Sequence, residues 1–120
     1  MARIAINGIE IDYEFIGDEG APAAILTPGG RYPRDYPGVI DLARELAKGG
    51  HRVLSWDRPN CGASDVSFDG ASESALHADT LIGLTEALGL QRYSLLGGSA
   101  GSRISLLTAA RNPERVEKLF

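Results

Sequence analysis

Apolar and polar residues alternate along residues 2–15, on both sides of the dipeptide Asn7-Gly8. Alternation is typical of a strand with one buried face, and Asn-Gly is a strong signal for a two-residue hairpin turn. We therefore predict an N-terminal hairpin of two antiparallel strands. The next apolar run, residues 23–28, lies between Pro22 and the glycines at 29–30, and it predicts a buried strand that enters a tight loop.

A helical period replaces the alternation after residue 35. Apolar residues recur every three or four positions between residues 39 and 47, which predicts an amphipathic helix. Asp35 is a candidate N-cap for this helix, and the pair Gly49-Gly50 is a candidate stop. Residues 51–56 (HRVLSW) then predict a short strand that ends in a cluster of turn-forming residues.

Helix and strand patterns continue to alternate in the second half of the chain. Ser72 or Ser74 can cap a helix whose leucines line one face. Residues 92–97 predict the next strand, residues 100–111 predict a third helix, and residues 115–120 resemble the beginning of another strand. This alternation predicts an α/β fold of three layers, in which a mostly parallel sheet carries helices on both faces.

Composition and charge narrow the class of protein. The 120 residues are 43% hydrophobic and 23% charged, as in an ordinary globular domain, and no repeat or linker divides residues 1–120. The net charge of −4, without a Lys/Arg cluster, argues against nucleic acid and anionic membranes as partners. Cys61 is the only cysteine, and residues 1–8 lack the apolar core of a secretion signal, so we expect a cytoplasmic protein.

A lone serine between glycines stands where a predicted strand meets a predicted helix. Residues 97–101 (GGSAG) fit the pattern G-x-S-x-G, in which a sharp, strained turn exposes the serine hydroxyl above the sheet. The first N–H groups of the following helix favour a negatively charged oxygen there. Two plainer interpretations stay open: a glycine-rich turn that only packs closely, and a loop that holds an anion without chemistry. The segment does not fit a phosphate-binding loop or a dinucleotide fingerprint.

Three motifs in this order resemble the N-terminal half of the α/β-hydrolase-fold enzymes. Residues 28–31 (PGGR) resemble the oxyanion loop of the family, residues 57–64 (DRPNCGAS) resemble its D-x-[RP]-G-x-G-x-S turn, and residues 97–101 resemble its nucleophile elbow. The chain departs from the family pattern at Pro28, where histidine is usual, and at Asn60, where glycine is usual. The resemblance covers essentially the whole chain, which is expected to be the N-terminal part of one hydrolase core domain.

The resemblance implies a serine hydrolase that cleaves an ester, amide or carbon–carbon bond through an acyl-enzyme, without a cofactor or a metal. Ser99 would be the nucleophile, and the N–H of Ala100 with that of Gly30 or Arg31 would form the oxyanion hole. In the family, the catalytic acid and histidine follow the serine in the chain. Residues 100–120 contain no histidine and no aspartate.

The other acids and bases of the chain are not expected to serve Ser99. Glu114 and Glu117 adjoin the start of the last predicted strand, which is the wrong end of the sheet. His51 opens its strand, about 16 Å below the carboxyl end, where sheets of this kind hold their sites. We expect His77 to lie on the surface of a helix.

The remaining polar candidates have structural interpretations. Asp57 is expected to hold its turn together by hydrogen bonds. Cys61 is expected to be a small turn residue, because no Cys/His spacing indicates a metal site. Arg31, Arg58 and Arg103 can reach a substrate carboxylate, although an exposed arginine is usually only solvated.

Two further functional hypotheses stand beside the hydrolase. The chain can be a non-catalytic piece that needs a partner chain with the acid and the histidine, and the open edge of its last strand invites pairing or self-association. It can also be a module that binds a small anion or acyl ligand at the glycine turn. We predict that the chain alone has little or no activity, whereas a complete parent acts on a small-molecule substrate.

Overall fold

The computed structural model describes residues 2–120, which form one mixed sheet of six strands. The strands are β1 (Ala2–Ile6), β2 (Ile9–Ile16), β3 (Ala23–Thr27), β4 (Arg52–Trp56), β5 (Tyr93–Gly97) and β6 (Val116–Leu119). They lie in the order β1-β2-β4-β3-β5-β6. The pairs β4–β3, β3–β5 and β5–β6 are parallel, and the two pairs that include β2 are antiparallel. The predicted, mostly parallel sheet is confirmed.

The N-terminal hairpin forms because of its turn residues. Asn7 and Gly8 have positive φ angles of 51° and 82°, as a type I′ turn requires, and Ile6 pairs with Ile9 across the turn. The second strand of the hairpin extends beyond the first and pairs with β4, where Tyr13 lies opposite Trp56. The hairpin is therefore part of the main sheet.

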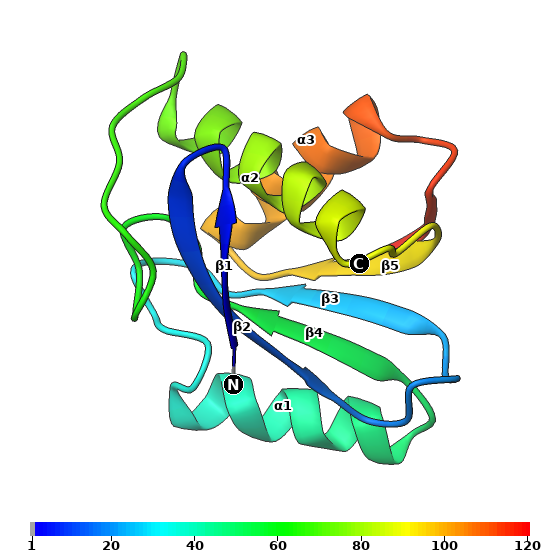
Figure 1. Cartoon of the computed structure of the whole chain (residues 1–120). Helices are drawn as coiled ribbons and strands as arrows, with labels where there is room; N and C mark the ends of the chain where they lie inside the picture. The colour runs from blue at the N-terminus through cyan, green and yellow to red at the C-terminus, as the bar shows by residue number, and fades with distance from the viewer. Residues whose placement is uncertain (1) are drawn as a thin grey trace.

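Three helices cover the two faces of the sheet (Figure 1). Helix α1 (Pro37–Lys48) lies on one face, and helices α2 (Glu73–Ala87) and α3 (Ala100–Arg111) lie together on the other. A parallel sheet needs this arrangement, because its strands are apolar on both sides. The predicted three layers are confirmed. Within residues 2–120, no helix combines the length and the apolar character that a membrane crossing requires.

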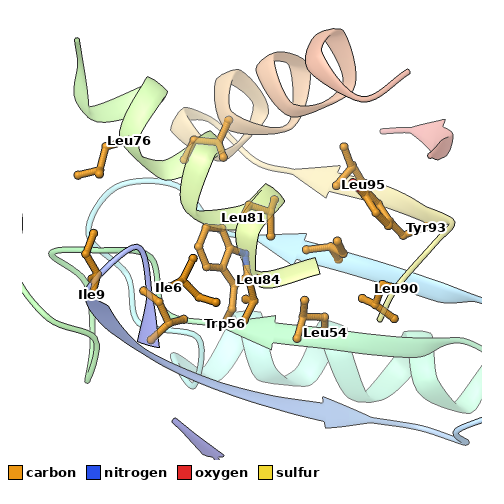
Figure 2. Close-up of a cluster of buried hydrophobic side chains, with 13 residues drawn as sticks. Ile6, Ile9, Leu54, Trp56, Leu76, Leu81, Leu84, Leu90, Tyr93 and Leu95 are labelled. Carbon is orange, nitrogen blue, oxygen red and sulfur yellow. The ribbon is translucent and has the colours of Figure 1, made fainter. Parts of the chain in front are cut away.

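The larger core lies between the sheet and helices α2 and α3. Trp56 at the end of β4 is completely buried there, and Figure 2 shows it beside Leu81 and Leu84 of α2. Its indole N–H donates to the hydroxyl of Thr27 at 3.0 Å, so the one polar atom of the ring is satisfied. Burial of side chains of this size contributes about 1.5–3 kcal/mol each, which makes this cluster a main source of stability.

The helix ends agree only partly with the prediction. Ser72 caps α2, because its Oγ accepts a hydrogen bond from the N–H of Ala75 at 3.1 Å. The prediction of Asp35 as the cap of α1 is wrong, since the N-cap is Tyr36 and makes no side-chain hydrogen bond. Pro37 explains the difference, because proline is favoured at the first helical position, and its neighbour on the N-terminal side then becomes the cap.

Candidate active site

Ser99 occupies the corner between β5 and α3. Its backbone angles, φ 52° and ψ −119°, are ones that a residue other than glycine rarely adopts. Such a conformation costs about 1–3 kcal/mol and persists only where the surrounding structure imposes it. The residue is exposed, and its side chain makes no capping hydrogen bond to α3. The strained conformation therefore exposes Ser99, whose side-chain hydroxyl is not used to cap helix α3.

Close backbone packing imposes this conformation. A Cβ atom on Gly97 would lie 2.4 Å from the carbonyl oxygen of Gly101, and one on Gly101 would lie 2.1 Å from the carbonyl oxygen of Thr27. Both separations are far below van der Waals contact, so only glycine fits at either position. The first turn of α3 thus rests directly on the carboxyl end of β3.

The loop that follows β3 packs against the Ser99 corner. A Cβ atom on Gly29 would lie 2.8 Å from the Cβ of Ser99 and 3.3 Å from the backbone N of Ala100. The N–H of Ala100 opens α3 and therefore has no acceptor inside the helix. In residues 2–120, no acceptor is hydrogen-bonded to the N–H of Gly30 or of Arg31 either. The structure therefore places the loop that carries Gly30 and Arg31 against Ser99 and Ala100, through the contact at Gly29.

Arg31 carries the only exposed charge among these four residues. Its Nη1 donates to Oε2 of Glu73 at 2.5 Å, and the side chain of Asn60 donates to the same oxygen at 3.3 Å. The hydrogen bond to Glu73 raises the pKa of Arg31, and the bond from Arg31 lowers the pKa of Glu73. These three residues, with residues 67–72 and Leu76, line a cavity of about 390 Å³ beside the loop.

The turn after β4 is held by the carboxylate of Asp57. Its Oδ1 accepts from the N–H of Arg34 at 2.7 Å, and its Oδ2 accepts from the N–H of Ala63 at 3.0 Å. A Cβ atom on Gly62 would lie 2.4 Å from the Asp57 carboxyl carbon, so the chain must carry glycine there. The predicted structural role of Asp57 is confirmed. Its carboxylate ties the loop after β3 to the turn after β4.

Asn60 and Cys61 also serve the turn after β4. Asn60 has a positive φ of 70°, and its side-chain amide exchanges two hydrogen bonds with the backbone of Ser67, at 2.9 and 2.8 Å. Asparagine tolerates this left-handed conformation better than most residues, so it replaces the glycine of the family pattern without a large cost. Cys61 is a buried free thiol. Within the described part of the chain, no three metal-binding side chains of the His, Cys, Asp and Glu types gather.

Two buried arginines brace the loop after β3, and sequence reasoning missed both. The expectation that Arg58 is exposed is wrong, because it is 2% exposed and its Nη2 donates to the carbonyls of Gly29 and Tyr32 at 3.2 and 3.3 Å. Burial lowers the pKa of Arg58. Arg34 is buried as well, in ion pairs of 3.0 Å with Asp12 and 2.8 Å with Glu14. A lone arginine in a polar loop carries no local signal of burial.

The expectation of a surface histidine at position 77 is also wrong. His77 is 3% exposed, and α2 is buried on much of its circumference because α3 and the sheet both pack against it. Its Nε2 lies 3.9 Å from Oε2 of Glu73 and has no hydrogen-bond partner within residues 2–120. Burial, together with the positive charge of Arg58, lowers the pKa of His77, which favours the neutral imidazole.

His51 and Glu117 lie away from Ser99, as predicted. His51 precedes β4, and its ring contacts the carbonyl of Leu46 at 3.2 Å, at the end of the sheet opposite the Ser99 corner. Glu117 forms an ion pair of 3.3 Å with Arg92, just before the first residue of β5. Arg103 is exposed on α3.

Comparison with known proteins agrees with this architecture. The sequence profile of the alpha/beta hydrolase fold matches residues 28–120. The chain belongs to the alpha/beta hydrolase fold family. The matched region includes the loop after β3, the turn after β4 and the Ser99 corner, so all three quoted motifs lie in the part that carries the family pattern.

Individual members of the alpha/beta hydrolase fold family resemble the chain over nearly its whole length. A 2-hydroxy-6-oxononadienedioate/2-hydroxy-6-oxononatrienedioate hydrolase of Pseudomonas putida is 31% identical, over 92% of this chain and 39% of its own length. The human serine hydrolase BPHL is 32% identical, over 98% of this chain and 40% of its own length. A crystal structure of a membrane phospholipase A superposes with a TM-score of 0.89 at 29% identity, over 98% of this chain and 37% of that one. The chain thus spans about two fifths of the length of these relatives.

Proposed function

We propose that the chain carries the nucleophile and the oxyanion hole of a serine hydrolase. The observation that carries the proposal is the strained Ser99 corner, an exposed hydroxyl held at φ 52° against a loop with free backbone donors. The two relatives described above, from Pseudomonas putida and human, are named as hydrolases, which supports the same reaction class. A close-packed turn without chemistry would have no need of a strained serine at its apex.

The proposed reaction begins with attack of the Ser99 Oγ on the carbonyl carbon of the substrate. A general base must take the hydroxyl proton, because a neutral serine is a weak nucleophile. The N–H of Ala100 and that of Gly30 or Arg31 would donate to the oxyanion of the tetrahedral intermediate. Collapse of that intermediate expels the leaving group and produces the acyl-enzyme, which water then hydrolyses.

The base and its acid are proposed to come from residues outside this sequence. No histidine or aspartate follows Ser99 in residues 100–120. His51 lies at the far end of the sheet, and His77 is buried beside Glu73, with no hydrogen bond to Ser99 within the described residues. We therefore expect the chain by itself to have little or no hydrolase activity. A small-molecule ester, amide or carbon–carbon substrate is proposed for the complete enzyme.

The outer edge of β6 is the proposed attachment point for a further strand, from a second copy or from a chain that carries the acid and the base. β6 pairs only with β5 within the described residues, and the nearby Leu119 and Phe120 are 40% and 69% exposed. An open strand edge with apolar side chains favours pairing. Sedimentation of the isolated chain as a monomer at high concentration would contradict self-association.

Phosphonylation of Ser99 tests the proposal. The chain is incubated with a fluorophosphonate, with and without imidazole as an external base, and the modified serine is located by peptide mass spectrometry. We expect slow reaction without imidazole and selective modification of Ser99 when imidazole supplies the base. Ser99→Ala must abolish the modification, and Ser72, which is exposed at the start of α2, is an internal control. Equal modification of both serines would refute the nucleophile assignment, and fast imidazole-independent reaction would refute the inactivity of the chain.

A further inference from the structure

Arg58 is a buried cation without a carboxylate partner. Its side chain is 2% exposed, and within residues 2–120 no ion pair joins it to an acid. Its Nε has no hydrogen-bond partner in the described chain. A buried guanidinium in this state is costly, so hydrophobic replacement of the same size is often neutral or stabilising. General stability does not account for an arginine at this position.

The hydrogen bonds of Arg58 point to a different role. One nitrogen, Nη2, donates to the carbonyls of Gly29 and Tyr32, the two ends of a turn that the N–H of Tyr32 closes on Gly29 at 3.3 Å. The peptide between Gly29 and Gly30 is planar and trans, so its N–H points away from its carbonyl. A carbonyl held by Arg58 therefore directs the Gly30 N–H away from Arg58.

The Ser99 corner fixes the same peptide from a second side. The α-carbon of Gly29 faces the corner so closely that a Cβ atom there would meet the Cβ of Ser99 at 2.8 Å. Gly30 has a positive φ of 53°, a conformation that an unrestrained glycine leaves readily. Packing against Ser99 sets the position of the peptide, and its carbonyl, which accepts from Arg58 and from the Tyr32 N–H, is held in one rotation. The second hydrogen bond of Arg58 holds the other end of the turn, at the carbonyl of Tyr32.

We propose that Arg58 is a positioning residue that orients the Gly30 N–H as an oxyanion donor. The inference rests on the proposed function for its catalytic meaning, whereas the orientation of the loop is measurable on its own. The charges around Arg58 fit this role. Arg31 adds to its positive potential, the carboxylate of Asp57 is engaged by two backbone N–H groups, and Glu73 is engaged by Arg31. Both nearby carboxylates already have other partners, which leaves the Arg58 guanidinium to the loop carbonyls.

Backbone dynamics of the chain test the proposal directly. Nitrogen-15 relaxation is measured for wild type, Arg58→Lys, Arg58→Met and the control Arg44→Met, whose arginine is exposed on α1. We expect the order parameter of Gly30 to fall from about 0.85 to below about 0.6 in Arg58→Met. Arg58→Lys keeps the positive charge but cannot reach both carbonyls with the same geometry. Its Gly30 order parameter is therefore expected to lie between those of wild type and Arg58→Met. Arg44→Met should match wild type.

A rescue experiment separates positioning from general stability. Methylguanidinium added to Arg58→Ala should restore the Gly30 order parameter and amide shift, and it should leave the amides of α1 unchanged. An unchanged Gly30 in Arg58→Met, or uniform loss of order in every loop of a folded Arg58→Lys, overturns the proposal. If Arg58→Met does not fold, Arg58→Lys and the rescue decide the question. Failure of Ser99 phosphonylation would refute the proposed hydrolase function. It would not affect the conclusion that Arg58 orients the Gly30 N–H.

Discussion

Gly101 is the residue where a single methyl group tests the packing of the Ser99 corner. A Cβ atom at this position would meet the carbonyl oxygen of Thr27 at 2.1 Å and that of Pro28 at 2.9 Å. Both obstacles are backbone atoms, which cannot rotate away as a flexible side chain does. Gly101→Ala therefore forces α3 and β3 to separate by about 1 Å in a close-packed interior.

The cost of that separation follows from two opposing terms. Overpacking of a rigid site costs about 1–3 kcal/mol and occasionally more, and a clash with two carbonyl oxygens belongs at the upper end. Alanine recovers at most about 1 kcal/mol through its higher helix propensity. We expect a net loss of roughly 2–3 kcal/mol, which lowers the melting temperature of a domain of this size by about 10 °C.

Gly98→Ala is the matched control, because a Cβ atom on Gly98 would meet nothing within 4 Å. Urea unfolding followed by circular dichroism gives the free energy of unfolding of both variants and of wild type. Gly98→Ala should lie within about 0.5 kcal/mol of wild type. If Gly101→Ala is as stable as Gly98→Ala, the corner is not packed as described, and the physical basis for the strain at Ser99 is lost.

Two further predictions concern helix α2. Ser72→Ala should lower the free energy of unfolding by about 1 kcal/mol, because it removes the acceptor for the Ala75 N–H, and Ser74→Ala should change it much less. The lowered pKa of His77 means that the unfolded state binds more protons than the folded state below about pH 6.5. Stability should therefore decline as the pH falls from 7 toward 5, by about 1.4 kcal/mol per unit of pKa difference. His77→Leu should flatten this dependence of stability on pH. If the wild-type profile is equally flat, burial does not disfavour the protonated form of His77 as described.

The elements that follow from local rules were predictable. The Asn7-Gly8 hairpin depends on backbone conformations that these two residue types favour, and the strand before Ser99 depends on a run of apolar residues. The start of α1 was mispredicted where two local signals compete. Asp35 is a good cap, but Pro37 can only begin a helix, and the constraint on φ is stronger than the preference for a capping oxygen.

The site residues were predictable where they belong to a local sequence motif. The positions of Ser99, Ala100, Gly30 and Arg31 followed from two glycine motifs, each at the end of a strand, and the structure brings these ends together. Their catalytic roles stay predictions until Ser99 is tested. The buried partners of the loop were beyond prediction, because Arg58, Arg34 and His77 each look like an ordinary exposed residue in the local sequence.

The sequence by itself determined the turns, the periods of the helices and strands, and the identity of the strained serine. These features depend on steric preferences and hydrophobic patterns that act over a few neighbouring residues. Only the tertiary structure decided which polar groups are buried and what they hold. Arg58 finds its acceptors 26 and 29 residues away in the chain, at Tyr32 and Gly29, and the pairing of β3 with β4 brings them within reach.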